Sequence, residues 1–171
     1  MKNLLKLFTL IVFCSFIQMS CTKLDDDTSI SDMTKAVIKG YAYANLDATN
    51  DTTNYYSIYW EKAPANSKII ARINASDLVQ NPNPSLTYGE LTYETTVGSD
   101  GSYTLEIPAG AKNVDVIIFA NDFEYNQKIW DETQIIPKTK TVRRVYHLSS
   151  EYTTVFKNAV KIVDLYFDDN N

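Results

Sequence analysis

Residues 93–109 read YETTVGSDGSYTLEIPA, and apolar and polar residues alternate on both sides of Asp100-Gly101. This period of two is that of a β-strand with one buried face. An Asp-Gly pair tolerates the positive φ angles that a tight hairpin turn requires. The stretch therefore predicts two strands, 93–97 and 103–107, paired as a β-hairpin.

The same alternation continues outward from this stretch in both directions. Tyr, Thr, Val and Ile, which favour strands, dominate the further segments, and Asn, Asp, Pro and Gly fill the connections. Residues 75–79 and 151–156 are each expected to form one helical turn. The pattern predicts an all-β fold, an antiparallel β-sandwich of seven or more strands. The further strands are expected over residues 38–44, 69–73, 114–118, 142–148 and 160–167.

The N-terminus has the layout of a secretory signal. Lys2 and Lys6 precede an apolar run that ends at Ile17, and the small residue Ser20 stands before Cys21. The run is shorter than the roughly 20 apolar residues that cross a bilayer. We therefore expect residues 1–20 to be a signal peptide, and no later segment of the sequence is apolar enough to span a membrane.

Cys21 decides whether the exported chain is released or anchored. Ser20-Cys21 resembles a lipobox, the cleavage motif of bacterial lipoproteins, although Gln18 stands where that motif usually has Leu. The resemblance implies that Cys21 carries a diacylglycerol and an N-acyl chain, which together anchor a protein stably. A plain secreted protein is the alternative. Cys14 would leave with the signal, so the mature chain would contain no thiol and no disulfide.

An acidic, polar segment over residues 21–33 is expected to be a tether, followed by one domain over residues 34–171. Its charged cluster consists of Lys23, Asp25, Asp26 and Asp27. This cluster is similar to the acidic export signal that follows the lipid cysteine of Bacteroidota surface lipoproteins. The similarity implies a location on the outer face of the outer membrane, and a solvated spacer is the alternative interpretation.

The chain is acidic, with 16 basic and 21 acidic side chains and a formal net charge of −5. Removing the signal takes away two basic side chains and no acidic one. Nucleic-acid binding needs a basic patch, so we expect no nucleic-acid partner. The one local basic cluster lies in a strand-like run and is expected to be an exposed face: Lys138, Lys140, Arg143 and Arg144.

The order of strands and turns resembles a known family. The segments that carry the resemblance are IKGYA (38–42), SKIIA (67–71), GSDGSYTLEIPA (98–109) and VDVII (114–118). They are similar to carboxypeptidase-regulatory-like, transthyretin-related domains, which open with an apolar-x-Gly-x-apolar strand and carry an Asp-Gly-x-Tyr hairpin. The resemblance covers residues 34–125 and implies a prealbumin-like, non-catalytic sandwich used as a spacer, folding aid or binding platform. The chain departs from the family in a Tyr-rich insertion at 45–60 and in two extra C-terminal strands.

The sequence offers little catalytic chemistry. His147 is the single histidine and lies in a strand pattern, and the chain has no nucleophile-elbow motif. Zinc disfavours sites built almost wholly from carboxylates, so no metal or cofactor is expected. A glycosidase would need two carboxylates in one cleft, and the sequence pairs none of its acidic residues. We expect a non-enzymatic protein, with a hydrolase as an alternative; its acidic residues include Glu90, Glu94, Asp122 and Glu124.

An oxygen-rich loop runs from Asp47 to Asp51. Calcium prefers oxygen ligands, so this loop is the candidate for a calcium site, although it does not match an EF-hand. An ordinary polar loop is the alternative. Asp51-Thr52-Thr53 also resembles the short O-glycosylation acceptor of Bacteroidota secreted proteins.

Aromatic residues cluster in the first third of the mature chain, among them Tyr41 and Tyr43. Flat rings stack on sugar rings and anchor protein interfaces. Packing of tyrosines within a sheet is the alternative. The candidate ligand-binding residues are Tyr55, Tyr56, Tyr59 and Trp60.

Together these observations predict a lipoprotein of the outer membrane, on the cell surface, with a structural, adhesive or accessory binding role. Its partners would be the membrane, through the lipid on Cys21, and an envelope protein or a glycan. The alternative function is that of a glycan-binding accessory lipoprotein in a polysaccharide uptake system. An exposed aromatic surface at residues 55–60 would favour this alternative, whereas a buried Trp60 would weaken it.

Overall fold

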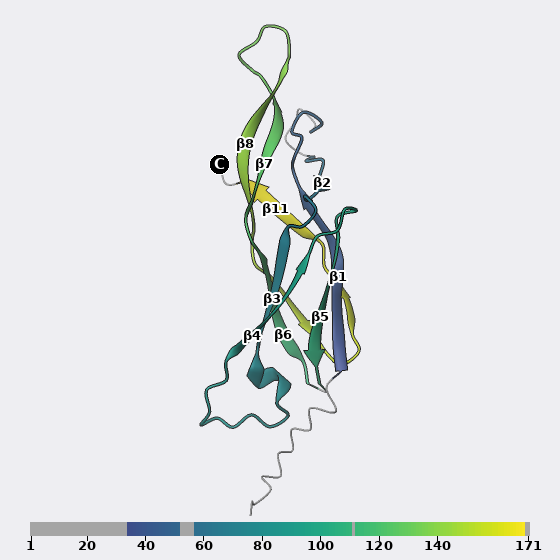
Figure 1. Ribbon diagram of the computed structural model, residues 1–171, viewed down its shortest axis with the longest axis vertical. Coiled ribbons are helices and arrows are strands. Elements are labelled where there is room, and N and C mark those ends of the chain that lie inside the picture. The colour runs from purple at the N-terminus through teal and green to yellow at the C-terminus, as the bar shows by residue number, and fades with distance from the viewer. Residues whose placement is uncertain (1–33, 52–56, 111, 170–171) are drawn as a thin grey trace, which may run out of the picture.

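Two β-sheets form the molecule in the computed structural model, which describes residues 34–51, 57–110 and 112–169 (Figure 1). The larger sheet has the strand order β10-β1-β11-β8-β7, and β2 and β5 also pair with β1. The smaller sheet has the order β4-β3-β6-β9. The prediction of an all-β sandwich is confirmed. No helix in the described ranges is long and apolar enough to cross a membrane.

The strands follow the predicted alternation closely. Those of the larger sheet are β1 (Thr34–Ala44), β2 (Glu61–Lys62), β5 (Ser102–Ala109), β7 (Phe123–Trp130), β8 (Thr139–Leu148), β10 (Val160–Ile162) and β11 (Leu165–Asp169). Those of the smaller sheet are β3 (Lys68–Asn74), β4 (Glu90–Thr96), β6 (Val114–Ala120) and β9 (Glu151–Val155). The predicted helical turn at 75–79 is confirmed as a 3-10 turn, η2 (Ala75–Leu78), in which the Ser76 N–H donates to the Asn74 side chain.

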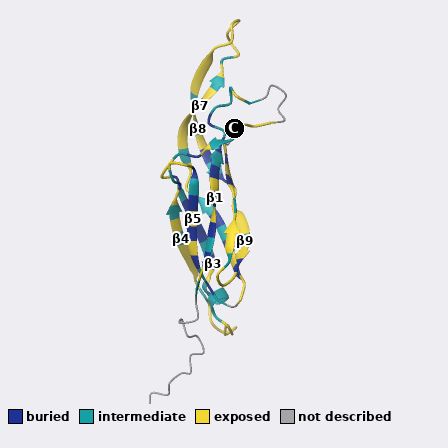
Figure 2. Cartoon of the chain, turned by 90° about the vertical axis from the view of Figure 1, so that its right-hand side faces the viewer, coloured by how far each residue is buried: buried dark blue, intermediate teal, exposed yellow. Residues whose placement is uncertain are grey.

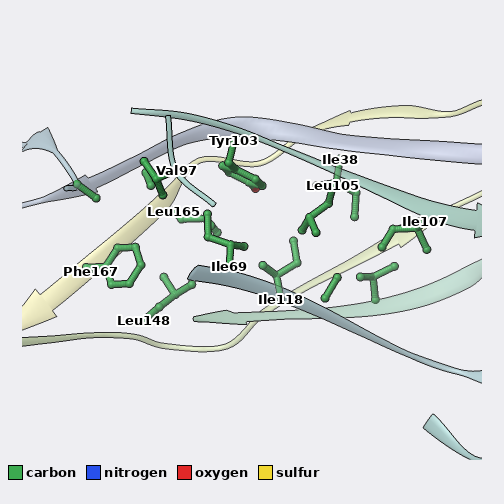
Figure 3. Packing of buried hydrophobic residues seen from close by; sticks show 14 of the residues in the cluster. Ile38, Ile69, Val97, Tyr103, Leu105, Ile107, Ile118, Leu148, Leu165 and Phe167 are labelled. Atoms are coloured by element: carbon green, nitrogen blue, oxygen red, sulfur yellow. The ribbon is translucent and has the colours of Figure 1, made fainter. Parts of the chain in front are cut away.

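One hydrophobic core lies between the two sheets. Alternate residues of β1, β3, β5 and β6 point into it, as the period-two pattern predicted (Figures 2 and 3). Ile38 and Leu105 come from the larger sheet, and Ile69 and Ile118 come from the smaller one. The described core residues lie between Ala36 and Phe167, and residues 34–169 contain no cysteine.

The predicted hairpin at Asp100-Gly101 is wrong, because its two strands belong to different sheets. β4 pairs with β3, and β5 pairs with β1. The turn itself forms, with Gly101 at φ 82° and the Gly98 N–H donating to the Ser102 carbonyl at 2.8 Å. Val97 is buried and its N–H donates to Ser67, so the end of β4 stays with the smaller sheet. The turn is therefore a corner between the sheets.

The expectation of a purely antiparallel sandwich is also corrected at the C-terminus. The predicted strand over 160–167 is divided into β10 and β11, and both run parallel to β1. Both halves keep one register, with Val37 opposite Val160 and Ala42 opposite Leu165. The ladder breaks between them because the Tyr41 N–H donates to the Asp164 side chain at 2.9 Å instead of to a backbone carbonyl.

The helical turn expected at 151–156 is wrong, since this segment forms β9. Its ladder to β6 places Val155 opposite Val114 and Thr153 opposite Val116, and Val155 is fully buried. A β-branched run beside an apolar strand gains more by pairing than by making an isolated helical turn.

β7 and β8 extend past the rest of the larger sheet as a two-stranded arm (Figure 1). The loop at its tip, residues 131–138, carries the exposed Ile135 and Ile136. β1 begins at the end of the larger sheet that is opposite the arm (Figure 1). Several predicted sites lie outside the described residues: Cys21, Lys23, Asp25, Asp26, Asp27, Tyr55 and Tyr56, as do Thr52 and Thr53 of the glycosylation acceptor.

Candidate functional site

Four aromatic rings form a row on the outer face of the larger sheet. Tyr41 and Tyr43 lie on β1, Tyr166 lies on β11, and Trp60 immediately precedes β2. The Tyr43 and Tyr166 rings are stacked, with centroids 5.4 Å apart. Trp60 meets Tyr166 edge to face at 5.1 Å, and Tyr41 lies 6.2 Å from Tyr43. We call these four residues the aromatic row.

Strand register builds this row. Tyr43 and Tyr166 are opposite each other in the parallel ladder of β1 and β11, so their side chains leave the sheet on the same face. Ala42, Ala44 and Phe167, their neighbours in sequence, are buried in the core. Because side chains alternate along a strand, burying these residues exposes the tyrosines.

The row is open to solvent but firmly supported. Tyr41 and Tyr166 are each 44% exposed, and Tyr43 and Trp60 are half-buried by their neighbours. Partial burial raises the pKa of Tyr43, and the charge of Asp164 and the adjacent tyrosines raise it further. Its hydroxyl therefore stays protonated around neutral pH and can donate a hydrogen bond. The row combines flat apolar faces with polar edges.

Two of the predicted ligand-binding residues are described, and one of them, Trp60, belongs to this row. Trp60 packs on Tyr166, whereas Tyr59 is exposed and its N–H donates to the Asp51 carboxylate at 2.7 Å. Tyr55 and Tyr56 lie outside the described residues. The sequence analysis missed Tyr166, whose signal was the alternation of LYFDD at 165–169, with Leu165 and Phe167 pointing inward.

A hollow lies between the far end of the arm and the loop that follows β1. It has a volume of about 710 Å³, and Trp130, Ile58 and Lys140 are among its lining residues. Asp51 and Glu132 are the carboxylates on its walls. Both oxygens of Asp51 already accept hydrogen bonds, from the Tyr59 N–H and the Asn45 amide. Among the described residues that line the hollow, Asp51 is thus already engaged by two donors.

In the oxygen-rich loop 47–51, the Asp47 carboxylate is already engaged by hydrogen-bond donors of the protein. The Asp47 carboxylate accepts hydrogen bonds from both the hydroxyl and the N–H of Thr49. It also forms an ion pair with Lys128 at 3.2 Å. Glu61 accepts the Leu46 and Asp47 N–H groups at 2.8 and 3.2 Å. The hydrogen bonds from Thr49 are the main reason that the pKa of Asp47 is lowered. Among the described residues, no three acidic, histidine or cysteine side chains gather where they could hold a metal.

The acidic residues considered for catalysis do not meet in one cleft. Glu90 and Glu94 lie on β4 of the smaller sheet, and Glu124 lies on β7 of the larger one. Each forms an ion pair on its own surface, with Arg72, Lys68 and Arg143 respectively. Asp122 lies in the turn between β6 and β7.

His147 lies opposite Asp168 in the ladder of β8 and β11. Its Nδ1 is buried and has no hydrogen-bond partner within the described part of the chain.

Three members of the basic cluster are paired with carboxylates. Lys140 pairs with Asp131 at 3.2 Å, Arg143 pairs with Glu124, and Arg144 pairs with Asp169 at 3.5 Å. The cluster is thus part of an ion-paired strand surface.

No family model and no curated protein matches this chain. Among solved structures, the chain is similar to the crystal structure of the major plantain pollen allergen Pla l 1. The sequence identity is 16%, the match covers 81% of this chain and 96% of that chain, and the TM-score is 0.34. So distant a likeness says nothing about what the chain binds.

Proposed function

We propose that this chain is a lipoprotein anchored through Cys21 to the outer membrane, on the cell surface, where it has a non-enzymatic adhesive or accessory binding role. We also propose that its sandwich is prealbumin-like and related to the carboxypeptidase-regulatory-like domains. The observation that carries the binding role is the aromatic row, because three tyrosines and a tryptophan on a solvent-facing sheet expose rings that the core does not need. In this first proposal, the row binds a protein of the cell envelope.

The position of the row fits an anchored protein. Thr34 follows the expected tether, and β1 runs from this end toward Tyr41 and Tyr43, away from the tether (Figure 1). A domain held at residue 34 would therefore present the row and the arm away from the anchoring membrane. Residues 21–33, fully extended, would span at most about 45 Å, which would limit how far the domain could stand from the membrane.

Protease treatment of intact cells tests the anchor and the surface location. Wild-type protein should stay with the cells and be clipped, and the Cys21→Ala variant should no longer be held by the membrane. If the wild-type protein is clipped only after the outer membrane is opened, it faces the periplasm and the surface location is wrong. If Cys21→Ala remains membrane-held, the lipid anchor is wrong.

Glycan binding is the second candidate, and the exposed part of the row favours it. The four rings contact one another, and Tyr41 and Tyr166, each 44% exposed, leave apolar ring surface open on which a sugar ring can stack. Electrophoresis of residues 22–171 through gels that contain starch, xylan, laminarin or mucin would show binding as retarded migration. Tyr166→Ala and Trp60→Ala should abolish any retardation.

Tyr125→Ala is the matched control. Tyr125 is 40% exposed, which is similar to the 44% of Tyr166, and it lies on β7, outside the row. It should leave retardation unchanged. Migration that is unaffected by all four polysaccharides, or equal losses in all three variants, would rule out the aromatic row as a site for these glycans.

A further inference from the structure

The four longer edge strands of the described sheets differ in how well they are protected. β4 carries Glu90 and Glu94, and β5 carries Glu106 and Pro108. β7 is covered by the loop that follows β1, since the Lys128 N–H donates to the Leu46 carbonyl at 3.1 Å. Charges, proline and covering loops are the usual means by which proteins prevent edge strands from pairing with another chain.

β9 has neither a proline nor, among the described residues, a covering loop. Its sequence is Glu-Tyr-Thr-Thr-Val, with a single charge at its first residue. It ends the smaller sheet, and among the described residues its backbone pairs with β6 alone. Figure 2 shows it as an exposed strand on the side of the molecule. Tyr152 is 75% exposed and the adjoining Phe156 is 57% exposed, so apolar side chains flank this open edge.

We propose that β9 pairs antiparallel with β9 of a second copy of this chain, about a two-fold axis at Thr153. The two smaller sheets would then form one continuous sheet across the dimer. A two-fold interface uses the same surface on both subunits, so it requires a strand that is complementary to itself. This inference does not depend on the lipid anchor or on the aromatic row.

The side chains of β9 meet that requirement. Pairing about Thr153 places Tyr152 opposite Thr154 of the second copy on the outer face, an aromatic and β-branched pair of the kind that stabilises sheets. On the inner face each Glu151 lies opposite Val155 of the other copy. Lys157 of that copy is two residues further along the chain. The two Glu151 carboxylates are thus kept apart, and each lies near a basic residue of the other copy.

Disulfide trapping tests the register directly. Residues 22–171 contain no cysteine, since Cys14 and Cys21 both precede them. A Thr153→Cys variant would place two thiols opposite each other on the axis, at a Cα separation that a disulfide can bridge. Under mild oxidation it should form a linked dimer several-fold faster than Thr154→Cys, whose neighbour across the axis is Tyr152. Equal rates for the two variants would overturn the proposed pairing.

Sedimentation of the same segment tests whether the dimer exists without a cross-link. Residues 22–171 should dimerise in the micromolar range, and Tyr152→Lys with Thr154→Lys should give a monomer because lysines then face each other. Tyr152→Glu with Thr154→Lys should restore the dimer, because each glutamate then faces a lysine. Thr92→Lys with Thr96→Lys on β4 is the matched control and should stay dimeric. A wild-type chain that remains monomeric at high micromolar concentration, or a double-lysine variant that still dimerises, would overturn the proposal.

Discussion

Gly40 lies where β1 passes the break between β10 and β11. A Cβ atom at this position would lie 1.9 Å from the Val163 carbonyl oxygen and 2.7 Å from its carbon, and both are backbone atoms that cannot rotate away. Gly40→Ala must therefore push β1 away from the C-terminal strand. We expect a loss of about 3 kcal/mol in the free energy of unfolding, measured by urea denaturation of residues 22–171.

Gly89→Ala is the control for this substitution. No atom lies within 4 Å of the Cβ position of Gly89, which precedes β4. The free energy of unfolding should change by less than about 1 kcal/mol. If the two alanine variants are equally stable, the close approach of β1 to Val163 does not exist in solution.

Tyr146 links stability to alkaline pH. Its ring is fully buried against Phe123, and its hydroxyl donates to the Asn45 carbonyl, which also accepts the Gln127 amide at 2.9 Å. Burial, with a further contribution from Asp169, raises the pKa of Tyr146 to about 12. A tyrosine in the unfolded chain ionises near pH 10. Between pH 10 and pH 12 the unfolded state therefore loses a proton that the folded state keeps.

The consequence is that stability falls as the pH rises through this window, because the folded state binds more protons than the unfolded state. At pH 7, Tyr146→Phe should cost about 1 kcal/mol for the lost hydrogen bond. Between pH 10 and pH 12 the variant should lose less stability than the wild type, as measured by urea denaturation at each pH. Parallel pH profiles for the two proteins would contradict the assignment to Tyr146.

Among the elements, the break between β10 and β11 depends on one side chain. The Asp164 carboxylate accepts the Tyr41 N–H that a backbone carbonyl would otherwise accept. Asp164→Ala should leave this N–H without its acceptor and cost about 1 kcal/mol. Hydrogen exchange of the Tyr41 amide should accelerate in this variant and remain slow in Asp164→Asn, which keeps an acceptor oxygen. Unchanged exchange in Asp164→Ala would show that β10 and β11 can form one uninterrupted ladder with β1.

The strands could be predicted because their signal is local. Ile38, Ala42 and Ala44 alternate with exposed residues in the sequence, and their burial follows from that alternation alone. The partner of each strand is not a local property. Asp100-Gly101 specifies a tight turn, but whether the strands on either side pair depends on where Val97 is buried. The hairpin was therefore predicted where a corner between sheets exists.

The same distinction applies to the candidate site. Tyrosines in the first third of the chain suggested an aromatic surface, and Trp60 does belong to one. Its centre is Tyr166, which lies far from Trp60 in sequence and reaches it only because β11 pairs with β1. No spacing within the chain encodes that parallel pairing. Whether Glu90, Glu94 and Glu124 meet in one cleft could not be predicted either, because it depends on which sheet β4 and β7 join.

At the scale of the whole molecule, the first and last strands are neighbours. β11 is inserted between β1 and β8, in the interior of the larger sheet. Its residues Leu165 and Phe167 are fully buried in the common core. The larger sheet cannot close until the end of the chain is in place, so the fold depends on contacts of high sequence separation. Such topologies fold slowly, because the long loop must close before its contacts are gained.

This topology gives the last prediction, which compares two deletions of similar size. Removing residues 165–171 deletes β11 and leaves β1 and β8 without their shared partner, so we expect no cooperative urea transition. Replacing residues 131–138, the exposed tip of the arm, with Asn-Gly removes a similar length of chain. Asn-Gly suits a tight turn, and every residue from 131 to 138 is partly or fully exposed, so the free energy of unfolding should change by less than about 1 kcal/mol. Circular dichroism monitors both transitions. A cooperative transition in the C-terminal deletion would mean that β1 and β8 hold the core without β11, and the closing role assigned to the last strand would be wrong.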